Sequence, residues 1–152
     1  MAGFVYPNGL SKMTDGTIDW VSGVTVIKVM LLDSGHTPDP DETAVTNLAT
    51  DELSGTGYAA GFGGAGRKVI GLMTNVFDSA NDRTELSGAG VTWTGINAGI
   101  ISYVAVIWED TNDAGSVPLA IFDSNEITNL PLTTNGGDVT ITWNAEGIIQ
   151  IS

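Results

Sequence analysis

Strict alternation of apolar and polar residues near the C-terminus is the feature that most limits the fold of this chain. Val139, Ile141 and Trp143 alternate with polar residues, which places them on one face of an extended strand. Residues 144–147 supply a turn that ends in a glycine, and a second apolar run follows. The pattern predicts a hairpin over residues 139–152 with one buried face.

Short runs of the same kind, separated by turn-forming residues, recur along the chain. The longest, Val24 to Leu32, is rich in β-branched residues and predicts a central strand that is buried on both faces toward its end. Together the runs predict an all-β fold, an antiparallel sandwich or jelly-roll-like domain with one or two short helices and Gly-rich loops. Further strands are expected at residues 17–20, 68–73, 75–78, 91–94, 102–108 and 118–122.

The length of 152 residues fits one domain. Residues 1–14 mix apolar positions with the breakers Pro7 and Asn8-Gly9, which predicts either an N-terminal arm or a short helix. Residues 15–152 are expected to form a single β domain. Within it, residues 41–50 predict a short helix that starts at an acidic cap.

Residues 51–66 contain six glycines and predict a flexible excursion that gains order from a partner. Gly61 to Gly66 has the G-x-G-x-x-G spacing of a dinucleotide site. Such a site needs a strand before the glycines and a helix that begins on them, and neither is expected here. A plain loop is therefore the favoured interpretation.

The formal charge of −13 disfavours direct nucleic-acid binding, because so acidic a surface repels phosphate backbones. The absence of cysteine excludes disulfides and thiolate metal sites, and it suits folding in a reducing cytosol. The sequence has no long apolar segment and no signal-peptide pattern, so neither membrane spanning nor secretion is expected.

Acidic turns raise the question of a bound cation. Residues 110–115 resemble the start of a calcium loop, but Ala114 and Ile121 stand where oxygen ligands are required. An irregular cation site stays open as an alternative to solvated acids. Its ligands would be Asp39, Asp41 and Glu42, or Asp110 and Asp113.

No catalytic constellation is evident, so the sequence predicts a protein without enzymatic activity and without a cofactor. His36 is the single histidine, and its position in a Gly/Thr-flanked loop predicts a surface residue. The adjacent acids Asp51-Glu52 and Glu109-Asp110 lack the aromatic platforms of a sugar-cleaving cleft, because the tryptophans are expected to fill a core or an interface.

Seven short phrases follow one another along the chain: Asp15–Asp19, Ile27–Val29, Glu52–Tyr58, Val91–Trp93, Tyr103–Ile107, Ile121–Asp123 and Val139–Ile151. Their order resembles that of a family of small virion structural proteins of tailed bacteriophages. The likeness spans nearly the whole chain, although each phrase is only a strand or a turn. The chain departs from the family where Pro7 and Asn8-Gly9 break what would otherwise be a longer helix.

This resemblance implies a capsid decoration, or cement, protein on the outer capsid surface of the virion, made in the host cytoplasm. The implied partner is the major capsid protein, and a homotrimer is the expected assembly. The alternative is a head-fibre, tail or host-surface recognition module. Contacts with a partner are expected from the N-terminal arm and the Gly-rich segment, at Phe4, Tyr6, Tyr58, Phe62 and Arg67.

Overall fold

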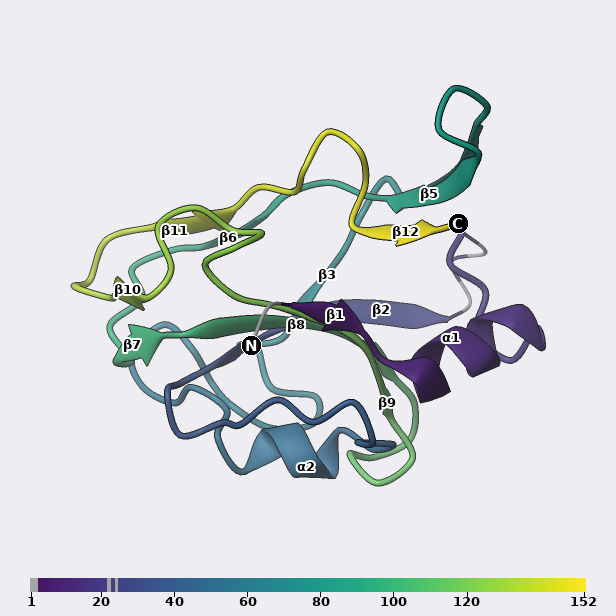
Figure 1. The fold of residues 1–152 in the computed structure, drawn as a ribbon. Helices are drawn as coiled ribbons and strands as arrows, with labels where there is room; N and C mark the ends of the chain where they lie inside the picture. The colour runs from purple at the N-terminus through teal and green to yellow at the C-terminus, as the bar shows by residue number, and fades with distance from the viewer. Residues whose placement is uncertain (1–2, 22, 24) are drawn as a thin grey trace.

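Each pair of neighbouring strands in the described part of the chain is antiparallel (Figure 1). The computed structural model describes residues 3–21, 23 and 25–152. The helices among these residues are short, α1 (Pro7–Thr14) and α2 (Thr46–Ala49). The predicted all-β, sandwich-like class with one or two short helices is therefore confirmed.

The first layer is a five-stranded sheet with the order β1-β9-β8-β2-β3. Its centre is the pairing of β2 with β8, which runs from Val26 opposite Glu109 to Leu32 opposite Tyr103. The predicted central strand is confirmed over β2, and Val24 lies outside the described residues. The strands are β1 (Phe4–Val5), β2 (Val26–Leu32), β3 (Lys68–Val69), β8 (Tyr103–Glu109) and β9 (Val117–Phe122).

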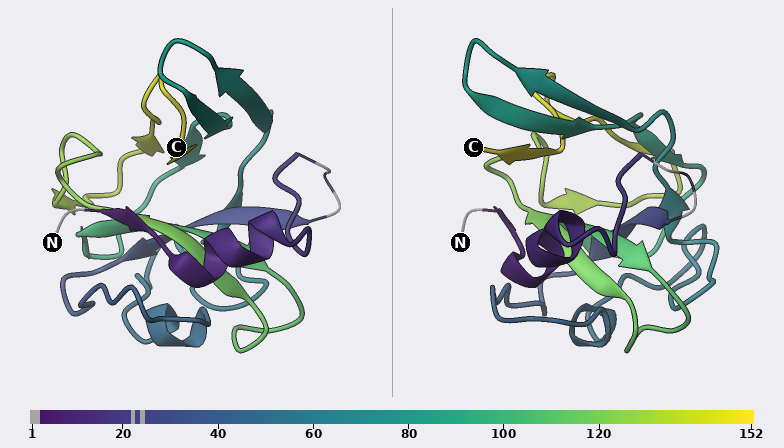
Figure 2. Two further views of the ribbon diagram at one scale, coloured as in Figure 1. Left: turned by 45° about the vertical axis from the view of Figure 1, so that its right-hand side comes forward. Right: turned by 90° about the vertical axis from the view of Figure 1, so that its right-hand side faces the viewer.

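The second layer consists of smaller sheets with the orders β12-β5-β4, β11-β6 and β10-β7. It lies across one face of the first layer, while α2 lies across the other (Figures 1 and 2). The strands are β4 (Thr74–Asp78), β5 (Arg83–Ser87), β6 (Val91–Trp93), β7 (Ile100–Ile101), β10 (Leu132–Thr133), β11 (Val139–Ile141) and β12 (Ile149–Ile151).

The central sheet is buried on both faces, which explains why β2 lacks alternation toward its end. Val29 and Leu31 face the second layer and belong to the larger core cluster with Trp93 and Ile141. On the opposite face Met30 and its neighbours pack against Tyr6 and α2. A strand that is buried on both faces has a continuous apolar sequence, without alternation.

The predicted C-terminal hairpin is wrong in its pairing. β11 pairs with β6, β12 pairs with β5, and the chain between them passes from one small sheet to the next. The alternation did identify buried positions, since Val139, Ile141 and Ile149 are all buried. Period-2 alternation reports which face is buried, but the choice of partner strand depends on residues far away in the sequence.

Other local predictions also need correction. Residues 17–20 are irregular although Ile18 and Trp20 are buried, because the Trp20 indole donates to the Ser87 carbonyl at 2.9 Å and fixes the segment without a ladder. The strand expected at 68–73 ends at Val69, since Leu72 takes a positive φ of 50°.

Helix α1 begins at the proline that was expected to interrupt it, because Pro7 occupies the first helical turn, where no backbone N–H is needed. Gly9 faces β9 and is buried. A Cβ atom at this position would lie 2.6 Å from the Pro118 carbonyl oxygen and 2.9 Å from the Leu119 Cα. The glycine therefore permits the close approach of α1 to the sheet.

Replacing Gly9 with alanine tests this approach. Helix propensity alone would favour alanine by about 1 kcal/mol. Because the clashing atoms belong to the β9 backbone, we expect Gly9→Ala to lower the free energy of unfolding by about 1–3 kcal/mol in urea titrations. Ser11→Ala, at an exposed position of the same helix, is the control and should change little. Equal stability of the two variants would contradict the packing of α1 described here.

Candidate functional site

The residues predicted to contact a partner divide into exposed and buried groups. Phe62 is 43% exposed and Phe4 is half-buried in β1. Tyr6, Tyr58 and Arg67 are at most 3% exposed. The expectation that these three present a surface to a partner is therefore wrong for this structure, because their polar atoms are all bonded within the chain.

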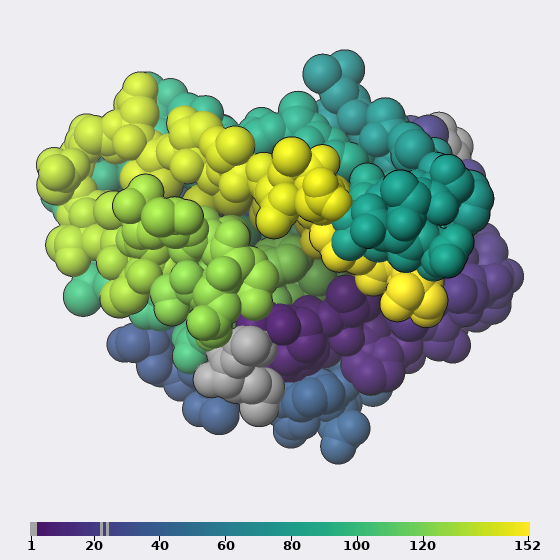
Figure 3. Space-filling view, turned by 45° about the horizontal axis from the view of Figure 1, so that its top comes forward, coloured from purple at the N-terminus to yellow at the C-terminus, as the bar shows by residue number. Residues whose placement is uncertain are grey.

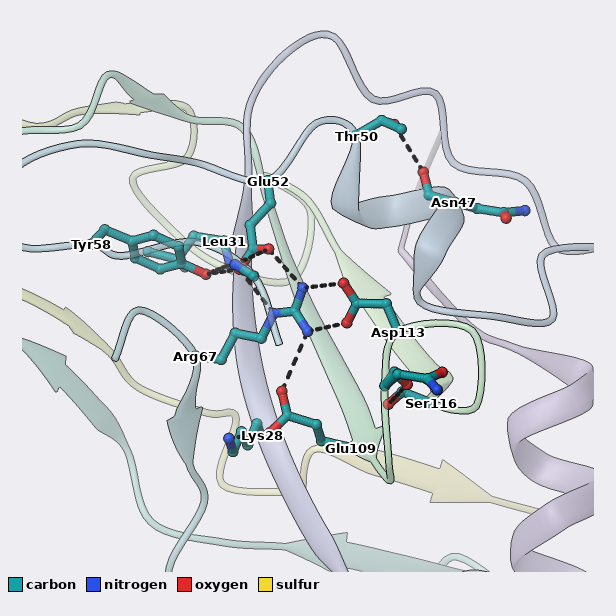
Figure 4. Close-up of polar contacts among 12 residues, drawn as sticks. Lys28, Leu31, Asn47, Thr50, Glu52, Tyr58, Arg67, Glu109, Asp113 and Ser116 are labelled. Atoms are coloured by element: carbon teal, nitrogen blue, oxygen red, sulfur yellow. Dashed lines mark hydrogen bonds and ion pairs between the residues drawn. The ribbon is translucent and has the colours of Figure 1, made fainter. Parts of the chain in front are cut away.

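The guanidinium of Arg67 is the centre of a buried ionic network (Figure 4). Its Nε and Nη2 donate to the two oxygens of Glu52 at 2.9 and 2.7 Å. Nη1 and Nη2 donate to Asp113 at 2.5 and 3.2 Å, and Nη1 also donates to Glu109 at 3.3 Å. The side chains of Arg67 and Glu52 are 0% and 1% exposed. All the donors of this planar group are thus used inside the protein.

The network extends into the Gly-rich segment through Glu52. This carboxylate also accepts hydrogen bonds from the Tyr58 hydroxyl at 3.1 Å and the Gly61 N–H at 3.0 Å. The Tyr58 oxygen in turn accepts from the Leu31 N–H of β2 at 3.0 Å. Burial, with the nearby charge of Glu52, raises the pKa of Tyr58 well above its ordinary value, so the hydroxyl keeps the proton it donates.

Arg67 keeps its charge in this buried setting. Burial lowers the pKa of Arg67, but its hydrogen bonds and ion pairs with Glu52 and Asp113 outweigh that effect and hold the pKa above its ordinary value. Glu109 is shared with Lys28 of β2, which forms a second ion pair with it. The cluster is a fixed structural element with a permanent positive charge at its centre.

Residues 51–66 are not a loose excursion, which corrects the sequence prediction. The Trp93 indole donates to the Gly66 carbonyl at 2.6 Å, and a Cβ on Gly66 would lie 2.6 Å from the Tyr58 ring. The glycines here permit close packing as well as turns. A signal for this packing was the pair of basic residues Arg67-Lys68 directly after a Gly-rich run in an otherwise acidic chain.

His36 is also buried, at 4% exposure, and not on the surface as predicted. Its Nδ1 lies 3.4 Å from an oxygen of Asp51, and its Nε2 lies 3.7 Å from an oxygen of Glu42. Glu42 accepts a hydrogen bond from the Tyr6 hydroxyl at 2.9 Å. The ring packs edge-on to Tyr103. This is the setting of a packed core histidine held between two acids.

Three of the five acids proposed as cation ligands, Asp39, Glu42 and Asp113, already have partners within the protein. Asp113 belongs to the Arg67 network, and Asp39 accepts a hydrogen bond from the Asp41 N–H. Among the described residues, one trio of acids lies close enough to share a cation. Arg83 forms ion pairs with all three of its members and so already supplies the positive charge. These acids are Asp78, Glu85 and Glu146.

An exposed apolar edge lies on the segment that follows the network. Val76 and Phe77 of β4 are 53% and 67% exposed, and Leu72, two residues before the strand, is 87% exposed. We call these three residues the β4 edge. β4 lies at the outside of its three-stranded sheet, and its hairpin with β5 projects from the body (Figure 2). An edge strand leaves one row of backbone groups without a ladder partner.

This edge has the properties of a protein-binding surface. Natural edge strands commonly carry lysine, proline or a bulge that blocks pairing, but residues 74–77 carry no charge and no proline. Val76 and Phe77 are successive residues, so their side chains project from opposite faces of β4, and each is largely exposed. Exposed large apolar side chains on an open strand edge are typical of interaction sites. Sequence reasoning identified the strand at 75–78 but not its exposure, because its apolar residues resemble those of a core strand.

Comparison with protein-family models, with curated proteins and with solved structures finds no match for this chain. No helix among the described residues is long and apolar enough to cross a membrane.

Removing the Arg67 charge tests the network. We expect Arg67→Met to lower the free energy of unfolding by about 3–5 kcal/mol, because it leaves Glu52 and its neighbours as uncompensated buried acids. Arg83→Met is the matched control: Arg83 also pairs with three acids, but at the surface, where solvent screens the charges. Chemical denaturation of both variants is the measurement, and an equal or larger loss in Arg83→Met would contradict the account.

Proposed function

We propose that this chain is a bacteriophage capsid decoration protein that binds the outside of the assembled capsid and stabilises it. The observation that carries the proposal is the β4 edge, an exposed apolar strand edge on a body that is otherwise acidic and internally fixed. The order of sequence phrases that resembles small virion proteins of tailed phages supports the same function. The partner is the major capsid protein.

The β4 edge offers a weak contact from each copy. Complete burial of a side chain such as Phe77 or Val76 against a partner contributes about 1.5–3 kcal/mol, and the open backbone row adds main-chain hydrogen bonds. A single contact of this strength would be short-lived. Many copies on a repeating lattice hold far more firmly, because linked contacts rebind before all of them dissociate.

The net charge fits the outer surface of a shell. With a formal charge of −13, each copy repels the packaged DNA. Decoration of the outside avoids that repulsion. We further propose a homotrimer at three-fold positions, since three linked β4 edges give each assembly the multivalent hold that one edge lacks.

A head-fibre, tail or host-surface recognition module is the second candidate function. One observation favours it, a cavity with aromatic and amide lining between the N-terminal strand and the C-terminal segment. Copy number separates the two functions. Hundreds of copies per virion indicate decoration, and a handful indicates a fibre or tail position.

Binding to capsids tests the role of the β4 edge. We expect the double variant Val76→Thr, Phe77→Ser to lose cosedimentation with undecorated capsids of the cognate phage, because the apolar contact is removed while both side chains are exposed and the fold is kept. Ile100→Ser, at a 47% exposed position of β7, is the control and should bind normally. Unchanged binding of the double variant would contradict the proposed contact.

The assembly state is tested by native mass spectrometry. A homotrimer predicts a particle of three times 15.8 kDa. The Val76→Thr, Phe77→Ser variant should give the same mass, because the β4 edge is assigned to the capsid and not to contacts between copies. A wild-type monomer would contradict the trimer, and a trimer that falls apart in the variant would contradict the assignment of the edge.

A further inference from the structure

A second surface feature lies away from the β4 edge. A cavity of about 340 Å³ lies between β1, the segment after β9 and the segment that precedes β12. Figure 3 shows the hollow between the purple N-terminal strand, the lime segment and the yellow C-terminal segment. This volume is at the lower end of the range of small-molecule sites, about 300–1,000 Å³. It suits a ligand of one or two small rings.

Aromatic side chains form one wall of the cavity. Phe122 and Trp143 are both half-buried, and their ring centroids lie 5.8 Å apart at an interplanar angle of 57°. The Trp143 indole N–H donates to the Ala89 carbonyl at 3.0 Å, which fixes the orientation of the ring. Val5 of β1 packs with the same core cluster and adds a further apolar side chain to the lining. The wall is therefore an apolar surface held in place before any ligand binds.

Polar groups with fixed orientation surround this wall. The Asn125 amide donates to Asp123 at 2.7 Å, which leaves its own carbonyl oxygen without a hydrogen bond among the described residues. In Asn144 the carbonyl oxygen accepts from the Glu146 N–H at 3.0 Å, which leaves the amide N–H₂ as donor.

Glu126 supplies a further oriented acceptor. Its Oε2 accepts from the Gly3 and Asp123 N–H groups at 3.2 and 3.1 Å, so Oε1 remains as an acceptor within the described part of the chain. The cavity thus offers one donor and two acceptors beside an aromatic wall. Both kinds of hydrogen-bonding partner are required by a ligand that carries hydroxyl groups.

The charge of the lining narrows the ligand class. Among the described residues that line the cavity there is no lysine, arginine or histidine, and Glu126 is the one acidic side chain. An anionic ligand would find no counter-charge on these residues, and the formal charge of −13 would repel it. A wholly apolar ligand would bury the amides and the carboxylate without partners, which is unfavourable. A neutral molecule with an apolar face and a rim of hydroxyls can pack against the aromatic wall and also form hydrogen bonds with the polar groups around it.

We propose that this cavity binds a neutral saccharide unit. The C–H face of the sugar ring lies against Trp143 and Phe122, and its hydroxyls exchange hydrogen bonds with Asn125, Glu126 and Asn144. The inference does not rest on capsid decoration, because the cavity and the β4 edge share no residue. A decoration protein with this site would add glycan binding to the outer surface of the virion.

The experiment uses the full chain and a panel of neutral sugars: glucose, galactose, mannose, N-acetylglucosamine and their short oligomers. Saturation-transfer NMR detects binding, and the indole resonance of Trp143 reports its location. We expect at least one sugar to bind with a dissociation constant on the order of 1 mM, as is usual for so small a contact, and to shift that resonance. No binding by any sugar of the panel would overturn the proposal.

Variants locate the site. We expect Trp143→Ala, Asn125→Ala and Asn144→Ala each to weaken binding by about tenfold or more. Asn125 and Asn144 are exposed, so their variants keep the fold. They therefore test the location of the sugar site even if Trp143→Ala is unstable. Asn47→Ala, an exposed amide on α2, is the matched control and should bind as the wild type does. Binding that survives both asparagine variants, or that Asn47→Ala weakens equally, would overturn the site.

Discussion

Arg67 joins acids from separate parts of the chain, and the arrangement of the loops depends on it. Glu52 lies at the start of the Gly-rich segment, Glu109 ends β8, and Asp113 lies in the turn that leads to β9. Burying this charge is favourable only while all its partners are present, because desolvation offsets much of the attraction. The network therefore contributes to a specific conformation more than to net stability. It holds a glycine-rich segment that has little intrinsic order in one packed form.

The buried polar groups of the network are satisfied within the chain, so contacts with other molecules must come from the surface. The β4 edge is apolar and open along one row of backbone groups, whereas the cavity beside Trp143 is mixed in polarity and enclosed by β1 and the C-terminal segment. The first suits a protein lattice and the second suits a hydroxylated small molecule.

Local patterns predicted β2, β4, β6, β8 and β9, but they misplaced a strand at residues 17–20, missed β5 and did not give the pairing. The β-branched run of β2 and the alternation at Val139 each identified buried positions, because burial leaves a periodic signal in nearby residues. The partner of β11 is β6, and no short-range pattern specifies that choice. The burial of His36 and Arg67 depends likewise on acids that are distant in sequence. The exposure of Phe77 could not be predicted either, because it depends on which strands lie beside β4.

The central claim is that this chain covers the outside of a capsid through its β4 edge. Cryo-electron microscopy of the virion that carries it tests the claim most directly, since the β domain has a distinct two-layered shape. The account predicts density for the chain at three-fold positions on the outer surface, with Phe77 facing the major capsid protein. Density confined to the tail, to a fibre or to the capsid interior would contradict it.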